Sequence, residues 1–171
     1  QFRELRLLNG LPLKSLAIGY IDVTDLASLK GHQLVELSLV GCKARDYAVL
    51  KDMPMRILNM NGSKVDDLAF VNNMPLDNLD ISNTKIADLS PLKGRPLKSL
   101  QINNSQVRDL RPIEGMELTF LSCQNVPVRN FDPLKKMPLT SIVMDGPTEA
   151  ARKILRTMPD LKYVNGREYE R

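Results

Sequence analysis

Residues 76–96 read LDNLDISNTKIADLSPLKGRP, and this stretch decides the fold because its apolar positions return along the rest of the chain. A step of 21 residues, repeated from Leu13, reaches an apolar residue every time: Leu34, Met55, Leu76, Leu97, Leu118 and Leu139. Five further apolar columns keep the same step without an insertion or deletion. A fixed period of this length is the sequence signature of a solenoid built from stacked coils.

The residues at the start of each period predict a short β-strand. Leu79 and Ile81 alternate with polar residues, a spacing that suits a strand with one buried face. The Leu79 column continues through the other coils as Leu16, Leu37, Leu58, Leu100, Leu121 and Ile142. Stacked copies would pair their strands into a parallel sheet, and each coil would bury its leucines only against its neighbours.

On these residues the chain resembles the leucine-rich-repeat proteins. The matching pattern is Leu76-x-x-Leu79-x-Ile81-x-x-Thr84-x-Ile86-x-x-Leu89-x-x-Leu92, and its equivalents stand in every coil. The Asp-Leu-Ser-Pro-Leu segment at 88–92 is similar to the short 21-residue repeats of bacterial internalins. The longer pattern Thr/Ser-x-Val-x-Asp-Leu-x-Pro-Leu-Lys-Gly-Met-Pro-Leu is similar to arrays attached to eukaryotic-like serine/threonine kinases. The resemblance implies an α/β fold, a right-handed solenoid with a parallel sheet on its concave face. Short turns or 3-10 segments would line the convex side, and a helix would cap the C-terminus.

One column departs from that family. Leucine-rich repeats usually place Asn at the turn after the strand, whereas this column reads Ile21, Cys42, Ser63, Thr84, Ser105, Val126 and Pro147. Hydroxyl groups can make some of the hydrogen bonds to the backbone that the Asn amide would make, but the side chains of Ile and Val cannot. We therefore expect these turns to be paired differently, or less completely, at the ends of the array.

We expect one leucine-rich-repeat domain over 1–171, with a partial first coil at 1–12, repeats at 13–147 and a C-terminal cap at 148–171. Phe2, Leu5 and Leu8 stand one step before Val23, Leu26 and Leu29, and the chain begins at Gln1 instead of Met. Both observations favour a piece of a longer protein. Thr148 is a suitable N-cap for a helix near 148–157, which a last short strand around 161–164 would follow.

Composition excludes several classes of protein. No apolar run approaches the roughly 20 residues of a membrane helix, and no signal peptide is visible. Two cysteines make no disulfide framework. A cytoplasmic location is slightly favoured and the cell surface stays open.

Reactive residues are few, and each has a structural explanation. His32, the one histidine, stands in a column that otherwise holds four methionines and Arg95. Cys42 and Cys123 occupy inward columns about four coils, on the order of 19 Å, apart, too far for a disulfide. The column Asp25, Asp46, Asp67, Asp88 and Asp109 is better placed to cap turns than to bind calcium, because a ladder spreads its oxygens apart. We predict no catalytic, cofactor or metal site, and therefore no enzyme.

The lysines form two outward columns, with Lys43, Lys64 and Lys85 in one and Lys30, Lys51, Lys93 and Lys135 in the other. The net charge is +4, acidic residues are interspersed and aromatic residues are scarce. This pattern is typical of a solvated edge, and it argues against nucleic-acid binding.

The outward residues of the strands are the candidate binding surface, because solenoids bind partners on the concave side. The middle coils are rich in Asn, Gln and Ser there, and Phe120 adds an aromatic side chain that can anchor an interface. The predicted partner-binding residues are Asn59, Asn61, Asn78, Asp80, Ser82, Asn83, Gln101, Asn103, Phe120 and Gln124.

The leading hypothesis is a non-enzymatic module that binds a protein or an extended peptide. Two alternatives stay open, a structural spacer or surface-display array and, less favoured, nucleic-acid binding through the lysine edge. Small polar residues could also fill a crowded concave face for packing alone.

Overall fold

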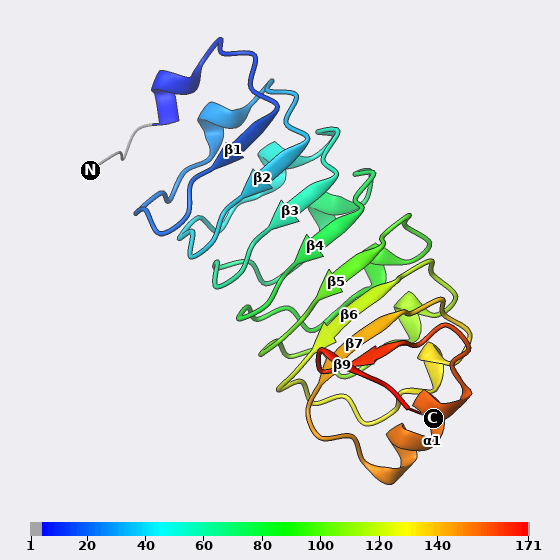
Figure 1. Ribbon diagram of the computed structural model, residues 1–171. Coiled ribbons are helices and arrows are strands. Elements are labelled where there is room, and N and C mark those ends of the chain that lie inside the picture. Colours follow the sequence, from blue (N-terminus) through cyan, green and yellow to red (C-terminus); the bar gives the residue numbers. More distant parts are fainter. Residues whose placement is uncertain (1–4, 171) are drawn as a thin grey trace.

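The computed structural model describes residues 5–170, which form a solenoid with strands along one side and 3-10 segments along the other (Figure 1). The seven repeated strands are β1 Ser15–Ala17, β2 Glu36–Ser38, β3 Ile57–Asn59, β4 Asn78–Asp80, β5 Ser99–Gln101, β6 Phe120–Cys123 and β7 Ser141–Met144. The 3-10 segments are η1 Leu5–Leu8, η2 Ala27–Leu29, η3 Ala48–Leu50, η4 Ala69–Val71, η5 Ser90–Leu92, η6 Arg111–Ile113 and η7 Asp132–Leu134.

The sheet keeps the sequence register throughout. Strands β1 to β7 pair in parallel and in chain order, and Leu16 faces Leu37 just as Leu79 faces Leu100, 21 residues on. A 21-residue step therefore translates one coil onto the next, and both the predicted parallel sheet and the predicted 3-10 side are confirmed.

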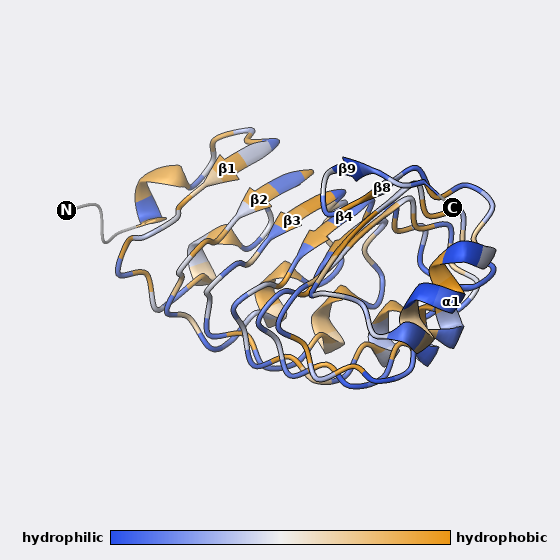
Figure 2. Cartoon of the chain, turned by 60° about the horizontal axis from the view of Figure 1, so that its bottom comes forward, coloured by the Kyte–Doolittle hydropathy of each residue, from blue (hydrophilic) through white to orange (hydrophobic). Residues whose placement is uncertain are grey.

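The core lies between the sheet and the 3-10 segments. The leucine columns of the strands are buried, as Leu58, Leu79 and Leu100 illustrate, and so are the columns of the opposite side, as in Leu89 and Leu92. The central leucine of β2 and of β5 is buried between more exposed polar residues, and the arrows change hydropathy along their length (Figure 2). Because neighbouring coils share one hydrophobic cluster, each coil depends on its neighbours for burial.

Each 3-10 segment from η2 to η7 is preceded by an acidic or amide cap. The Asp88 Oδ1 accepts a hydrogen bond from the Ser90 N–H at 2.8 Å, and the Asp25 Oδ1 accepts one from the Ala27 N–H at 2.7 Å. Asp46, Asp67, Asp109 and Asn130 make the same bond two residues ahead. The acidic column therefore caps turns, as predicted.

The turn column after the strands is satisfied unevenly. The Thr84 hydroxyl donates to the Ile81 carbonyl at 2.6 Å, and the Cys42 thiol donates to the Val23 carbonyl at 3.4 Å. The Ser105 hydroxyl, in contrast, is buried and has no hydrogen-bond partner among the described residues. A hydroxyl thus replaces the usual amide well in one coil and poorly in the next.

The C-terminal cap contains the predicted helix and strand and one further strand. Helix α1 spans Glu149–Thr157, and the Thr148 hydroxyl accepts from the Ala151 N–H at 3.2 Å. Strand β8 Tyr163–Val164 continues the sheet in parallel, and β9 Arg167–Glu168 turns back antiparallel to it. Asn165 and Gly166 form the turn with φ of +54° and +74°. An Asn-Gly pair between two strands is a strong hairpin signal.

The N-terminal end begins at η1, one step before η2, as the repeat predicts. Phe2, which the pattern places in the same partial coil, lies outside the described residues.

Candidate functional site: the outer sheet face

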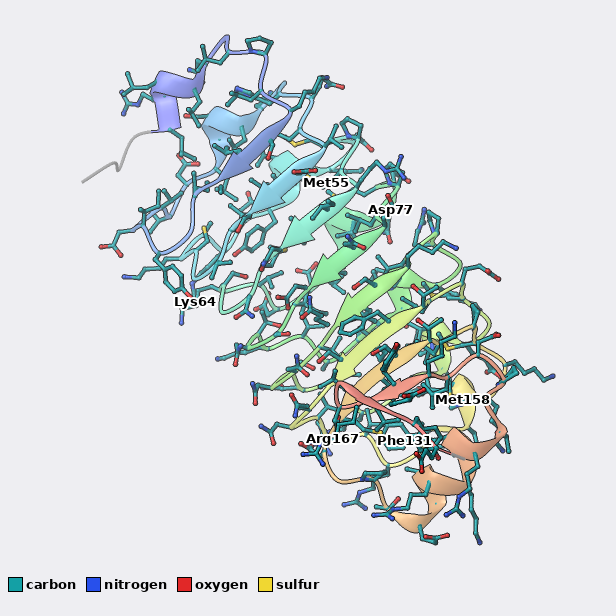
Figure 3. All side chains as sticks on the ribbon, in the orientation of Figure 1. Met55, Lys64, Asp77, Phe131, Met158 and Arg167 are labelled. Carbon is teal, nitrogen blue, oxygen red and sulfur yellow. The ribbon has the colours of Figure 1, made fainter. Side chains whose placement is uncertain are left out.

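The outer sheet face consists of the strand side chains that point away from the core, together with the residues just after each strand. Figure 3 shows these side chains standing above the strands. Three rows cross the sheet: the first runs from Ser15 through Asn78 to Ser141, the second from Ala17 through Asp80 to Val143, and the third from Gly19 through Ser82 to Asp145.

Two of the predicted binding residues lie deeper than strand alternation predicts. The exposed fraction is 9% for Asp80 and 2% for Ser82. The Asp80 Oδ1 accepts from the Ser82 N–H at 2.9 Å, and its Oδ2 accepts from the Asn61 amide at 3.3 Å. Side chains from adjacent coils thus cover the carboxylate and satisfy it internally.

These bonds belong to a longer chain of contacts that we call the polar network: Asn59, Asn61, Asp80, Ser82, Asn103 and Ser122. The Asn59 Oδ1 accepts from the Asn61 N–H at 3.0 Å. Further along, the Asn103 amide donates to the Ser82 hydroxyl at 3.4 Å, and its Oδ1 accepts from the Ser122 hydroxyl at 2.8 Å. The polar network joins four consecutive coils, so the hydrogen bonds of its members primarily stabilise the packing of one coil on the next.

Asn83 belongs to a second row, the asparagine ladder, which runs along the turns that follow the strands. The Asn83 amide donates to the Asn61 Oδ1 at 3.0 Å, Asn104 donates to Asn83 at 2.9 Å, and Asn125 donates to Asn104 at 2.9 Å. All three turn residues have positive φ, between +52° and +57°. Asn tolerates that conformation better than most residues, which explains the column.

Four predicted residues keep side chains free for a partner. Asn78 and Gln124 are exposed, while Gln101 and Phe120 are half-buried. The side-chain amides of Asn78, Gln101 and Gln124 make no hydrogen bond within residues 5–170. Their donors and acceptors can therefore be used by a bound molecule.

Two apolar residues on this face were not among the predicted site residues. Tyr163 pairs with Ser141, which pairs with Phe120, so the first row ends in a tyrosine with an exposed fraction of 47%. Tyr163 lies 22 residues after Ser141, one more than the repeat length, so the 21-residue periodicity does not predict its place in this row. Ile57, in the same row, is 38% exposed.

The described residues present no reactive group on this face. Burial raises the pKa of the Cys123 thiol to about 12, and burial also raises the pKa of Cys42. The His32 ring lies buried between two carbonyls, with Nε2 3.0 Å from the Leu8 oxygen and Nδ1 3.2 Å from the Leu29 oxygen. Both thiols and the imidazole are therefore structural, as expected from their columns.

Some charged groups at the margins form ion pairs. Lys43 forms an ion pair with Asp22, and Arg56 forms one with Asp77. A hydrogen bond from Arg111 lowers the pKa of Asp109. Within residues 5–170 no group of three or more His, Cys, Asp or Glu side chains could hold a metal ion.

Comparison with solved structures identifies the fold. Internalin C2 of Listeria monocytogenes superimposes with a TM-score of 0.80 and 24% identity, over 94% of this chain and 73% of that one. This chain has the fold of an internalin-type leucine-rich-repeat solenoid. An internalin (InlF) of the same organism gives a TM-score of 0.76 and 21% identity, over 89% of this chain and 47% of that one.

The sequence comparisons gave no further match. No protein-family model matches the chain, and neither does any curated protein. Among the described residues, none of the helices has the length and apolarity needed to cross a membrane.

Proposed function

We propose that the chain is a non-enzymatic interaction module that holds an extended segment of a partner protein on its outer sheet face. The observation that carries this proposal is the set of unpaired amides at Asn78, Gln101 and Gln124, beside the ring of Phe120. They stand on a surface where the neighbouring polar groups are already hydrogen-bonded to one another.

The three amides lie on a diagonal. Asn78 pairs across the sheet with Ser99, two residues before Gln101, and Gln101 pairs with Ser122, two residues before Gln124. One strand spacing of about 4.8 Å and a shift of two residues, about 6.6 Å, give a step of roughly 8 Å. Alternate residues of an extended peptide are separated by a comparable about 7 Å, so successive amides can bind its backbone.

The aromatic side chains would supply the anchor. Phe120 and Tyr163 lie two strands apart in one row, with Ser141 between them and Val143 in the next row. Exposed aromatic groups carry a large share of the energy at interfaces because they bury much area at little entropic cost. An apolar side chain of the bound segment would lie between the two rings.

Peptide selection tests the proposal without a known partner. We would select binders from a library of random peptides on the intact array and measure affinity by fluorescence polarisation. Gln101→Ala and Phe120→Ala should each weaken binding by at least about tenfold. The matched control is Gln106→Ala, which removes an exposed glutamine from outside the strands. Selected peptides that lose no affinity with the first two variants would refute the proposal.

One observation favours a second function, a rigid spacer or display array. In the polar network and the asparagine ladder, many polar side chains form hydrogen bonds between coils. A spacer requires rigidity and no free surface. If peptide selection enriches no binder while the solenoid remains folded, the spacer function is preferred. Nucleic-acid binding through the lysine edge is less favoured, because Lys43 already pairs with Asp22.

A further inference from the structure

Two of the buried columns of the solenoid become partly exposed in its last repeat. Leu26, Tyr47, Leu68, Leu89 and Leu110 form one column, and each is at most 5% exposed. Phe131, the next residue of that column, is half-buried. Val128 is likewise half-buried, although its column is fully buried in Val107 and Ile86. The cause is the change of element, because α1 follows this repeat in place of another 3-10 segment.

A groove of about 360 Å³ lies where α1 replaces the next coil. Phe131 lies on one side of it, and Ala150 and Ile154 of α1 lie on the other. Figure 3 labels Phe131 at this end of the molecule, beside the ribbon of α1. Of its apolar lining, Phe131 and Ala150 stay accessible, whereas Ile154 is buried.

The rim of this groove is positively charged. Arg129, Lys135 and Lys153 line it, and Asp132 is its one carboxylate. Asp132 is bound to the Lys135 ammonium at 2.6 Å. Arg129 and Lys153 are exposed and form no ion pair within the described residues. Two cationic groups thus remain without a counter-charge around an apolar floor.

The corresponding furrow between η3 and η4 differs in both respects. Its lining carries two carboxylates, Asp46 and Asp67, beside Arg45 and Lys51. Its aromatic residues, Tyr47 and Phe70, are buried and stacked on each other with ring centres 5.5 Å apart. Compared with that furrow, the C-terminal groove has one carboxylate in place of two and an aromatic side chain that is only half-buried.

From this combination we infer that the groove between η7 and α1 is a second docking surface, which takes an acidic protein segment. One apolar side chain of that segment packs on Phe131 and Ala150, and its flanking carboxylates pair with Arg129 and Lys153. Charge complementarity selects an acidic partner over a neutral one. A groove of this volume also suits an inserted side chain better than a flat membrane surface.

The probe for this surface is a fluorescein-labelled peptide with one central leucine and three acidic residues on each side. We expect it to bind the intact array with an affinity that falls as salt rises. Lys153→Glu and Arg129→Glu should each weaken binding by at least about tenfold. The control is Lys93→Glu, which makes the same change of charge at an exposed lysine two coils before Lys135, outside the groove lining, and should change affinity less than twofold.

A second probe, with serine in place of the leucine, tests the apolar floor and should bind at least about fivefold more weakly. Equal binding of the two peptides would contradict the inference, and so would equal losses in the Lys93 and Lys153 variants. The absence of peptide binding at low salt would also overturn the inference. So would a dimer of the array that Lys153→Glu dissociates. A third contradicting result would be retention of the array on phosphatidylserine vesicles that the leucine peptide does not displace. Thermal unfolding of each variant verifies that the fold is intact.

Discussion

At the scale of single residues, a side-chain oxygen two positions before the first residue of each segment from η2 to η7 fixes the turn. Asp88 and Asn130 make the same bond with different chemistry, since one acceptor is a carboxylate and the other an amide. The amide oxygen is therefore sufficient for the cap. Only the carboxylate makes the cap depend on pH.

The Asp88→Asn variant tests this difference. Hydrogen bonds from the hydroxyl and the N–H of Ser90 lower the pKa of Asp88 in the folded state. A lowered folded-state pKa stabilises the protein above the unfolded pKa, near 3.9, and this stability is lost as the pH falls through the folded pKa. Urea unfolding at pH 7 and pH 3 should show a smaller loss for Asp88→Asn than for the native chain. An identical loss would indicate that this cap does not contribute.

At the scale of elements, much of the structure follows from sequence periodicity. The strands, the 3-10 segments and α1 were predictable because apolar spacing and the Thr148 cap act locally. The depth of Asp80 and the asparagine ladder were not predictable in this way. They depend on which side chains from adjacent coils reach one another, as Asn61 reaches Asp80 at 3.3 Å.

The ladder residue Asn104 separates backbone strain from hydrogen bonding. Its φ is +54°, a left-handed conformation that the Cβ disfavours by about 1–2 kcal/mol, and Asn104→Ala keeps the Cβ but loses the amide whose hydrogen bonds offset that cost. Asn104→Gly loses the same side-chain bonds without that strain, and Gly41 and Gly62 already stand in this column. Urea denaturation should show the Ala variant to be less stable than the Gly variant by about 1–2 kcal/mol. Equal stabilities would exclude strain as the reason for Asn in the column.

At the scale of the whole molecule, each coil is stabilised by the coils on either side of it, so the effect of a core substitution depends on its position along the solenoid. Leu16 and Leu100 occupy the same column, but Leu16 lies in the first strand and is half-buried, whereas Leu100 is fully buried between two coils. The predicted division into a partial coil, repeats and a cap stays a prediction at this scale.

We predict that Leu100→Ala lowers the free energy of unfolding by about 2–5 kcal/mol, the usual cost of truncating a fully buried leucine. Leu16→Ala should cost clearly less, because its site is already open to solvent. Denaturant unfolding followed by circular dichroism measures both. Equal costs would contradict the dependence on neighbouring coils.

The central claim is that the outer sheet face binds an extended protein segment through unpaired amides. NMR of the side-chain NH₂ signals, recorded while a selected peptide is added, tests it most directly. The claim predicts that the signals of Asn78, Gln101 and Gln124 shift together at the same peptide concentration, while that of Gln106 stays in place. Shifts confined to Gln106 or to the residues of α1, with the three amides unchanged, would contradict it.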